Sequence, residues 1–560
     1  MKKTIHSLLA AALLWGACAT AGKKNSHDMA VNRNLTTFNA MVKALDENYV
    51  DSVRTDEAFK AAIAALLGTV DPYTEYYTAD ETENLRNMTT GEYAGIGSII
   101  LVRDGITYIS EPLEGSPAYR AGLRAGDKIL SVDTVNTLEP KNQNVSKLLR
   151  GQAGTQVAIT VARPYPEEGT DTVRTYTVTR EKVQQPSVPY YGRINGGRTG
   201  YVRLTSFIDK SPAEMREALK SFAEGTPVEG VILDLRGNGG GLVESAVEIL
   251  GDFLPKGTEV LRTRGRDTSL EKTYRTSRKP LMPDVPLVVL IDGGSASASE
   301  ITAGAIQDLD RGVLVGSRSF GKGLVQGTLP MPYDGLLKVT MAKYYIPSGR
   351  LIQALDYSRR NPDGTVAYTP DSLTSVYHTR AGREVRDGGG LQPDTTLTWA
   401  SPSALLIKLM RDNKIFDFAT RFVASHPENP DGEEIITVTD GIYGDFTASL
   451  DTVGFDYERR CATLLGHLRD AIREEGYLND EATAEMDRLE ELLKHDLQRD
   501  LELKRPEISQ YIAEELMTRY GFEKGRIRTE LQNDPGITAA LEILGDPARY
   551  ASMLGKPKRK

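Results

Sequence analysis

The sequence predicts a multidomain α/β protein, and three observations support that prediction. Short β-branched runs separated by glycines fill residues 91–183, which is typical of a β-rich module. Strand patterns alternate with helix patterns over residues 187–398, which indicates an α/β core with parallel strands. Apolar residues at helical spacing dominate residues 30–90 and 401–560. We therefore expect a small N-terminal helical segment and a helical C-terminal extension around the two central domains.

The composition and net charge limit the kinds of binding partner that we expect. The chain has 560 residues, 40% of them hydrophobic, which is enough for several domains with a large core. Its 68 Lys and Arg against 77 Asp and Glu give a net charge of -9. That balance provides no basic field for nucleic acid or for an anionic membrane. We expect polypeptide or small-molecule partners and no nucleic acid.

The first residues have the layout of an export signal. Two lysines precede the apolar run "LLAAALLWGACATAG" within residues 1–22, and this run is too short to span a bilayer. Two interpretations stay open: Cys18 is a lipid-modified residue that anchors the protein to a membrane, or cleavage follows Ala21. The second cysteine is Cys461, so a chain without the signal has no intramolecular disulfide. We expect an exported protein of the periplasm or cell envelope.

The segment over residues 30–90 is expected to be helical. "LTTFNAMVKALDENYV" and "DEAFKAAIAALLG" space their apolar residues three and four positions apart. The stretch "DPYTEYY" that follows them is predicted to be a turn.

The β-rich module is predicted from strand-like runs and two short helices. The runs include "GITYISEPL", "DKILSVD", "TQVAITVAR" and "RTYTVTRE". One helix lies in "GSPAYRAGL", where Ser116 suits the cap and Pro117 the first turn. The second is expected in "KNQNVSKLLRG", and the linker "VQQPSVP" ends the module at residue 183.

Two motifs give this module a family resemblance. "EYAGIGSIIL" followed by "GSPAYRAGLRAGDKILSVD" resembles a PDZ domain of the bacterial protease type. The resemblance implies that the loop of Gly95, Ile96 and Gly97 turns backbone N–H groups toward the terminal carboxylate of a peptide, which adds as a strand. Glycine allows the close backbone approach that such a loop needs. A glycine bulge in a strand is the structural alternative, and the second motif favours the PDZ interpretation.

The core is predicted from a repeated order of elements. "SPAEMREALKSFAEG" is an amphipathic helix opened by Ser211, and "VILDLRGNGGG" and "VPLVVLIDGGSASASE" each join a buried strand to a glycine-rich turn and a helix. Parallel strands with right-handed crossovers are expected, with the active site at their carboxyl ends. Phosphate binding at "DLRGNGGG" is weakly supported, because no G-K-[ST] follows.

The second turn carries Ser295, Ser297 and Ser299 where a helix begins. Serines at such positions are most often caps, and a nucleophilic serine needs a base. The chain has six histidines, none of them in the core motifs: His6, His27, His378, His426, His467 and His495. A Ser-His-Asp triad is therefore not supported, although His378 stays open. The other base is a lysine, and Lys322 stands in "SRSFGKGLVQG".

A second family resemblance rests on the spacing of the motifs in the core. The "SASASE" turn, "FGKG" with Lys322 25 positions after Ser297, Gln326 four further on and "LKVTMAKYYIPSGRLIQ" resemble the C-terminal processing peptidases, or tail-specific proteases. The resemblance extends over about residues 35–400. It implies that Ser297 is the nucleophile, Lys322 the general base and Gln326 the residue that orients the lysine. Ser295 and Ser299 are then a turn residue and a cap.

Physical chemistry is consistent with these roles. Acting as a base at neutral pH requires lowering the lysine pKa from 10.4 by about three units, or roughly 4 kcal/mol, through burial. Phe320, Leu324 and Val325 supply apolar neighbours for Lys322. Gln326 can accept and donate hydrogen bonds without a negative charge that would raise that pKa again.

The resemblance also implies an oxyanion hole. One donor is the backbone N–H of Ala298, at a helix N-terminus that favours negative charge. The other comes from Gly240 or Gly241, and that choice stays open. Glu300 and Asp308 lie on the same predicted helix, where they either organise the site or pack. We expect no metal and no cofactor.

The C-terminal extension, residues 401–560, is predicted to be helical and interrupted at Pro506. No catalytic motif occurs in it. We interpret it as a packing or assembly element, with a homo-oligomer among the arrangements that it allows, and the final "GKPKRK" as a solvated tail.

Together these features predict an exported serine endopeptidase that cuts protein substrates near their C-termini. The PDZ domain would capture a free C-terminus, so the expected partners are proteins and peptides with free C-termini. The alternative is a non-catalytic PDZ scaffold that binds peptides. The presence of Ser297, Lys322 and Gln326 together favours the enzyme.

Overall fold

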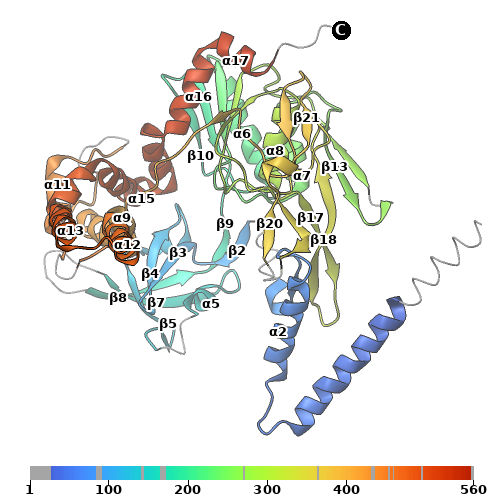
Figure 1. Cartoon of the computed structure of the whole chain (residues 1–560), viewed down its shortest axis with the longest axis horizontal. Coiled ribbons are helices and arrows are strands. Elements are labelled where there is room, and N and C mark those ends of the chain that lie inside the picture. The colour runs from blue at the N-terminus through green and yellow to red at the C-terminus, as the bar shows by residue number, and fades with distance from the viewer. Residues whose placement is uncertain are drawn as a thin grey trace, which may run out of the picture. The chain divides into compact units, whose positions relative to one another are not determined.

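The computed structural model divides into two compact units (Figure 1). The first comprises Met1–Ala79 and Gln326–Thr340, and the second Asp80–Val325 and Met341–Lys560. The structure describes residues 27–82, 91–139, 144–163, 172–268, 271–361, 365–429, 435–451, 455–457, 460–493 and 496–555. The expected signal, residues 1–22 with Cys18, and the "GKPKRK" tail from residue 556 onward lie outside these ranges.

The first unit contains the predicted N-terminal helices. A helix covers residues 27–48, and α2 covers Thr55–Gly68. Their rings Phe38 and Phe59 meet edge to face, with centroids 6.3 Å apart. The predicted turn is shorter than expected, because residues 75–77 form strand β1 (Glu75–Tyr77), which pairs antiparallel with β18 (Leu336–Tyr345). Pairing with the distant strand β18, rather than the local sequence, makes these three residues a strand.

The β-rich module has the predicted strands and both predicted helices. Its main sheet has the strand order β3-β4-β5-β7-β8, with β6 on β5, and β2 pairs with β9. Ser116 caps α4 by accepting a hydrogen bond from the Tyr119 N–H at 3.2 Å, as predicted. The elements are β2 (Glu92–Gly95), β3 (Ser98–Arg103), β4 (Ile106–Pro112), α4 (Pro117–Ala121), β5 (Lys128–Val132), β6 (Val135–Asn136), α5 (Val145–Leu149), β7 (Gln156–Arg163), β8 (Thr172–Thr179) and β9 (Glu181–Gln184).

The core is the predicted α/β sheet with parallel strands. Its order is β10-β11-β12-β15-β16-β23, antiparallel between β10 and β11 and parallel from β11 onward. Every residue of β12 and β15 is buried, because helices cover both faces, and this explains their continuous apolar runs. The strands are β10 (Tyr190–Ile194), β11 (Thr199–Arg203), β12 (Gly230–Asp234), β15 (Leu287–Ile291), β16 (Val313–Gly316) and β23 (Thr395–Thr396).

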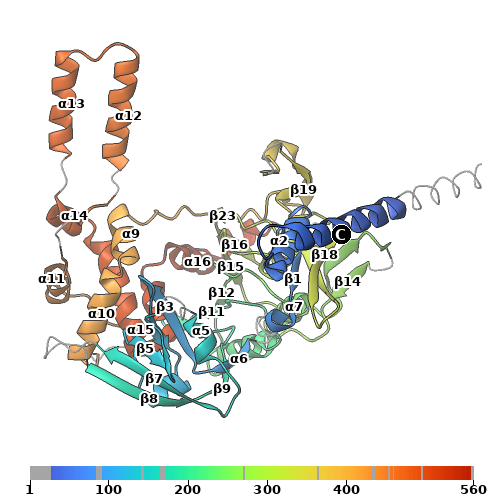
Figure 2. The ribbon, with the colours of Figure 1, turned by 90° about the horizontal axis from the view of Figure 1, so that it is seen from below.

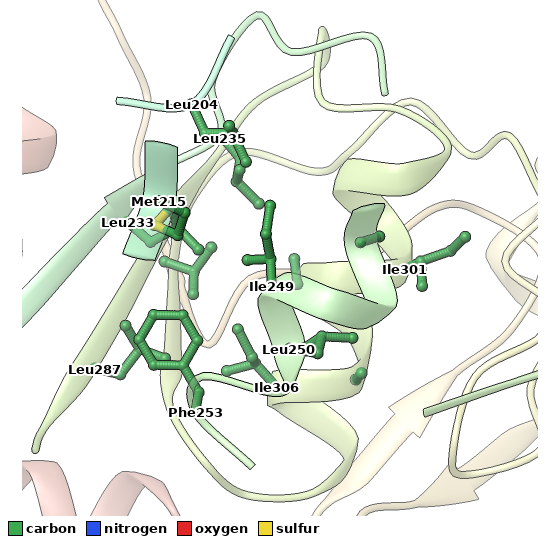
Figure 3. Packing of buried hydrophobic residues seen from close by; sticks show 14 of the residues in the cluster. Leu204, Met215, Leu233, Leu235, Ile249, Leu250, Phe253, Leu287, Ile301 and Ile306 are labelled. Atoms are coloured by element: carbon green, nitrogen blue, oxygen red, sulfur yellow. The ribbon is translucent and has the colours of Figure 1, made fainter. Parts of the chain in front are cut away.

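Two apolar clusters sandwich this sheet. On one face α6 (Ser211–Ala223), α7 (Val243–Leu250) and α8 (Ala298–Asp308) pack, and Figure 3 shows Leu233 and Ile249 within that cluster. On the other, α16 (Pro535–Gly545) packs against β12, β15 and β16. The C-terminal extension therefore supplies part of the α/β core.

Smaller antiparallel elements complete the central region. The exposed residue His378 lies on the hairpin β21–β22, apart from the core sheet. The elements are β13 (Glu259–Gly265), β14 (Lys272–Arg275), β17 (Leu324–Pro330), β19 (Leu355–Arg360), β20 (Val366–Tyr368), β21 (Val376–His378) and β22 (Glu384–Arg386).

The C-terminal extension is helical, as predicted, and has a core of its own. Pro506 lies in the first turn of α15, directly after α14 ends, so the predicted interruption is a helix boundary. Inside α15, Phe522 has φ 55° and ψ -162°, which breaks the helix into two halves. Figure 2 shows α12 and α13 as a hairpin. The helices are α9 (Ala404–Arg411), α10 (Lys414–Ser425), α11 (Asp440–Ala448), α12 (Arg460–Glu474), α13 (Asp480–Leu492), α14 (Leu497–Leu503), α15 (Arg505–Gln532), α16 and α17 (Pro547–Met553).

Within the described ranges, no helix combines the length and the apolar character needed to cross a membrane.

Candidate active site

The serine turn joins β15 to α8 through a strained residue. Ser297 occupies the N-cap position of α8 with φ 55° and ψ -112°. A positive φ is unusual for a residue with a side chain and costs on the order of 1–3 kcal/mol. Such strain persists only where the surroundings impose it, and it is most frequent at functional sites.

The three serines have different environments. Ser295 and Ser299 are fully buried, whereas Ser297 is half-buried. The Ser295 hydroxyl donates to the Leu235 carbonyl and the Ser299 hydroxyl to the Asn238 carbonyl, each at 2.8 Å. The prediction that Ser295 is a turn residue is confirmed. The prediction that Ser299 is a cap is wrong, because Ser297 takes that position and Ser299 is bonded across to the glycine turn instead.

Glu300 connects the serine turn to the lysine segment. Its Oε2 accepts the backbone N–H groups of Ser297 and Lys322, each at 2.9 Å. Its Oε1 accepts the Ser319 hydroxyl at 2.5 Å and the Gly321 N–H at 2.7 Å. Of the two interpretations left open for Glu300, organisation of the site is the one that these contacts favour.

The electrostatics of Glu300 follow from its burial. The side chain is fully buried, and this desolvation raises its pKa above the ordinary value of a glutamate. The four donated hydrogen bonds act in the opposite direction, since they stabilise the carboxylate. The S-x-x-E spacing of Ser297 and Glu300 is that of a capping box, so this local signal was available in the sequence. The contacts to residues 319–322 had no such signal.

Lys322 is half-buried in a segment whose residues differ in exposure. Gly321 and Gly323 on either side are buried, and the Gly323 N–H donates to Gln353 Oε1 at 2.7 Å. Of its expected apolar neighbours, Leu324 is buried, but Phe320 is 42% exposed. The predicted apolar surroundings of the lysine are therefore only partly provided by these adjacent residues.

Gln326 and Asp308 lie in separate hydrogen-bonded settings. Gln326 is on β17, in the first compact unit, and its Nε2 donates to Thr340 Oγ1 at 3.1 Å. Its contact with the lysine stays a prediction. Asp308, at the other end of α8, forms a fully buried ion pair with Arg350 at 2.8 Å. Asp308 thus anchors the end of the helix, as the packing interpretation holds.

The glycine turn after β12 lies directly against the serine turn. A Cβ on Gly240 would lie 2.7 Å from the Ala296 carbonyl oxygen and 2.8 Å from the Ala298 nitrogen, and its φ is +99°. Only glycine fits there. The Gly240 N–H donates to Asn238 Oδ1 at 2.9 Å. Of the two glycines considered as the second oxyanion donor, Gly240 therefore already has a partner within the turn. Ala298 is the first residue of α8, where backbone N–H groups have no partner within the helix.

The loop of Gly95, Ile96 and Gly97 is held by the start of α4. The Ile96 carbonyl accepts the Ala118 N–H at 2.8 Å, and Ile96 is buried. Gly97 has φ +73°, and a Cβ there would lie 2.6 Å from the Ser116 Cβ. Strand β3, which follows the loop, is at the edge of its sheet, where an added strand has room to pair.

Among the residues that the structure describes, no cluster of three or more histidines, cysteines or acidic residues has the arrangement of a metal site.

Three family models match consecutive parts of the chain. Peptidase family S41 matches residues 198–366, and a PDZ domain model matches residues 108–163. A model described as "Probable PDZ-protease, C-terminal helical domain" matches residues 405–544. In chain order, the matches fall on the β-rich module, the core and the C-terminal extension.

Two relatives and one solved structure are similar to more than half of the chain. The chain is 33% identical over 326 residues to the carboxy-terminal-processing protease of Bartonella bacilliformis, covering 58% of this chain and 73% of that protein. It is 33% identical over 322 residues to a probable CtpA-like serine protease of Staphylococcus aureus strain N315, covering 57% and 62%. A solved structure, the photosystem II D1 C-terminal processing protease, is 28% identical with a TM-score of 0.34, covering 64% of this chain and 86% of that one. At 33% identity over 73% of the Bartonella bacilliformis protein, the chain belongs to the family of carboxy-terminal-processing proteases, which are serine-type peptidases.

Proposed function

We propose that this protein is an exported endopeptidase that binds the free C-terminus of a protein substrate on its PDZ domain and cleaves nearby, with Ser297 as nucleophile and Lys322 as general base. The observation that carries the proposal is Glu300. One oxygen of its carboxylate accepts the backbone N–H groups of both residues, each at 2.9 Å. A single buried group thus fixes the two segments that the chemistry needs.

The reaction would proceed through an acyl-enzyme. Ser297 Oγ attacks the scissile carbonyl carbon while Lys322 Nζ takes the hydroxyl proton. The tetrahedral intermediate collapses when the C–N bond breaks and the lysine gives its proton to the leaving amine. Water, deprotonated by the same lysine, then attacks the ester carbonyl; the ester C–O bond breaks, the lysine returns the proton to Ser297 Oγ, and the second product leaves as an acid.

We assign the oxyanion donors to the backbone N–H groups of Ala298 and Gly241. Ala298 follows the nucleophile at the N-terminus of α8, where the helix dipole favours negative charge. Gly241 is preferred over Gly240 because the Gly240 N–H already donates to Asn238. Gln326, fixed by its hydrogen bond to Thr340, would orient the lysine amine without adding charge.

Substrate capture would use the edge of the PDZ domain. The terminal carboxylate would bind the N–H groups of the loop Gly95, Ile96 and Gly97, and the preceding residues would pair with β3. The edge position of β3 and the rigid support of the loop by α4 favour this mode.

Export is proposed from the sequence of residues 1–22 alone. Lipid attachment at Cys18 and cleavage after Ala21 give mature N-termini of different mass. Mass spectrometry of the protein purified from its native envelope fraction distinguishes the two.

The dyad is tested by Ser297→Ala and Lys322→Ala, assayed on a labelled unstructured polypeptide with a free apolar C-terminus. Each variant should lose at least about 1,000-fold in kcat and keep its thermal unfolding profile. Full activity in either variant contradicts the assignment. Blocking the substrate's C-terminus as an amide should lower kcat/KM in the wild type. A protein that binds this substrate and never cuts it would be the PDZ scaffold instead.

A further inference from the structure

A buried ion-pair cluster lies directly before the glycine turn. Arg236 follows β12, and its Nη2 contacts Asp234 Oδ2 and Asp534 Oδ2, each at 2.6 Å. Its Nε adds a second bond to Asp234, at 2.9 Å. The guanidinium is thus shared between a carboxylate of the peptidase core and one of the C-terminal extension.

The cluster is largely removed from solvent. The side chains of Arg236, Asp234 and Asp534 are 15%, 1% and 13% exposed. Burial alone disfavours a charged Arg236, but the two carboxylates outweigh it and hold the pKa of the guanidinium above its ordinary value. Asp234 also accepts the Tyr201 hydroxyl at 2.8 Å. Buried charges that are bonded this completely fix geometry, and removing one carboxylate leaves the buried arginine with fewer partners.

Asp534 has two bonding roles at once. It is the N-cap of α16, where its Oδ1 accepts the Gly536 N–H at 2.6 Å. Its Oδ2 holds Arg236. A Cβ on Gly536 would lie 3.1 Å from Arg236 Nη1, so the start of α16 lies closely against the guanidinium. Packing of Ile537 and Ile543 against the sheet keeps the helix in this position.

Arg236 is coupled by backbone bonds to the residues that border the nucleophile. Its own N–H donates to Asp234 Oδ1 at 3.0 Å, and the next N–H, of Gly237, donates to Asp292 in the serine turn at 2.9 Å. Asn238 accepts the Ala296 N–H at 3.0 Å. A shift of Arg236 would therefore move the turn that carries Gly241.

We propose that Asp534, from the C-terminal extension, is a positioning residue for the peptidase reaction: it fixes Arg236, and through it the glycine turn that faces Ser297. This inference rests on the proposed oxyanion role of that turn. It gives the extension a part in catalysis, beyond packing, although no atom of Asp534 touches the substrate.

Two substitutions at Asp534 test its charge and its helix-capping role separately. Asp534→Asn keeps a good N-cap but loses the charge on Arg236, and Asp534→Glu keeps the charge but is a poor cap. The matched control is Asp546→Asn, at the N-cap of α17, where Asp546 accepts the Ala548 and Arg549 N–H groups but forms no ion pair with an arginine side chain in the described part of the chain.

We expect kcat of Asp534→Asn to fall about tenfold with little change in KM, which is less than the ~100-fold expected for a 1 Å displacement of a reacting group. Asp534→Glu should retain more kcat than Asp534→Asn although it unfolds at a lower temperature. Asp546→Asn should keep the wild-type kcat, because Arg236 retains both carboxylate partners in that variant.

Three results would overturn the proposal: wild-type kcat in Asp534→Asn, a kcat that follows melting temperature across all three variants, or an Asp534→Asn protein that does not fold. In the last case Asp534 would be a stability element alone. An inactive wild type contradicts the proposed function instead, so the two failures are distinguishable.

Discussion

Two strand–turn–helix units build the candidate site, and they use opposite means. In the unit from β15 to α8, side chains fasten the turn: Asp292 accepts the N–H groups of Gly294 and Ser295, and Glu300 accepts that of Ser297. In the unit from β12 to α7, the absence of side chains at Gly240 and Gly241 makes room for the backbone. The serine turn is held by hydrogen bonds to its own side chains, whereas the glycine turn also requires that Gly240 and Gly241 have no side chain.

The difference teaches where each turn is vulnerable. A turn fastened by hydrogen bonds loses them one at a time when a side chain is removed. A turn that depends on close backbone approach fails when any Cβ is added, because carbonyl and amide atoms cannot move aside. The largest effects should therefore come from additions to the glycine turn.

Among substitutions that leave Ser297 and Lys322 in place, Gly240→Ala should have the largest effect. The added Cβ would meet the Ala296 oxygen at 2.7 Å, at a φ of +99° that alanine rarely adopts. We expect kcat/KM to fall at least about 100-fold and the free energy of unfolding to fall by about 2–4 kcal/mol. Kinetics and denaturant unfolding measure the two changes. Gly239→Ala is the control, since a Cβ there meets no atom within 4 Å; equal effects of the two substitutions would contradict the close-approach account.

Glu300→Gln should come next. A glutamine has one accepting oxygen, and its NH₂ would face N–H and O–H donors that now bond the second carboxylate oxygen. We expect kcat to fall by about 10- to 100-fold, because the Ser297 and Lys322 segments lose their common partner. The control is Glu244→Gln, an exposed position in the first turn of α7. Unchanged kcat in Glu300→Gln would show that the two segments hold their places without it.

Ser299→Ala should have the smallest effect of the three. It removes one buried hydrogen bond, to the Asn238 carbonyl, which keeps the Ala296 N–H as a donor. A loss of about 1 kcal/mol in the free energy of unfolding and of about threefold in kcat is expected. Chemical denaturation and steady-state kinetics measure these, with Ser221→Ala as control, because that hydroxyl bonds only within α6. A larger loss of kcat in Ser299→Ala than in Glu300→Gln would contradict this order of effects.

Much of the fold could be predicted because its signals are local. The buried strands and helices of the core follow from residue periodicity. Ser116 and Pro117 indicated where α4 begins. Strand β1 was missed because its pairing with β18 is made with a distant segment. Ser299 was misassigned because a cap is defined by which serine adopts a non-helical φ and ψ, and that position fell to Ser297.

The site was predictable in its residue types but not in its supports. The spacing of Ser297, Lys322 and Gln326 is a linear pattern, so a resemblance can reveal it. The bonds of Glu300 to residues 319–322, and of Asp534 to Arg236, join positions far apart in the chain. No periodicity or motif in a single sequence encodes which distant partner a buried carboxylate will meet.

The break in α15 at Phe522 has a consequence for any attempt to shorten this enzyme. Residues before the break, such as Ile512, belong to the core of the extension, whereas Ile527 after it belongs to the face of the peptidase sheet. A truncation at residue 400 would therefore uncover Val288 and Leu290, an apolar surface that promotes aggregation. We therefore expect a shortened protein to need the segment after Phe522 joined to the core by a new linker, rather than a stop codon at residue 400.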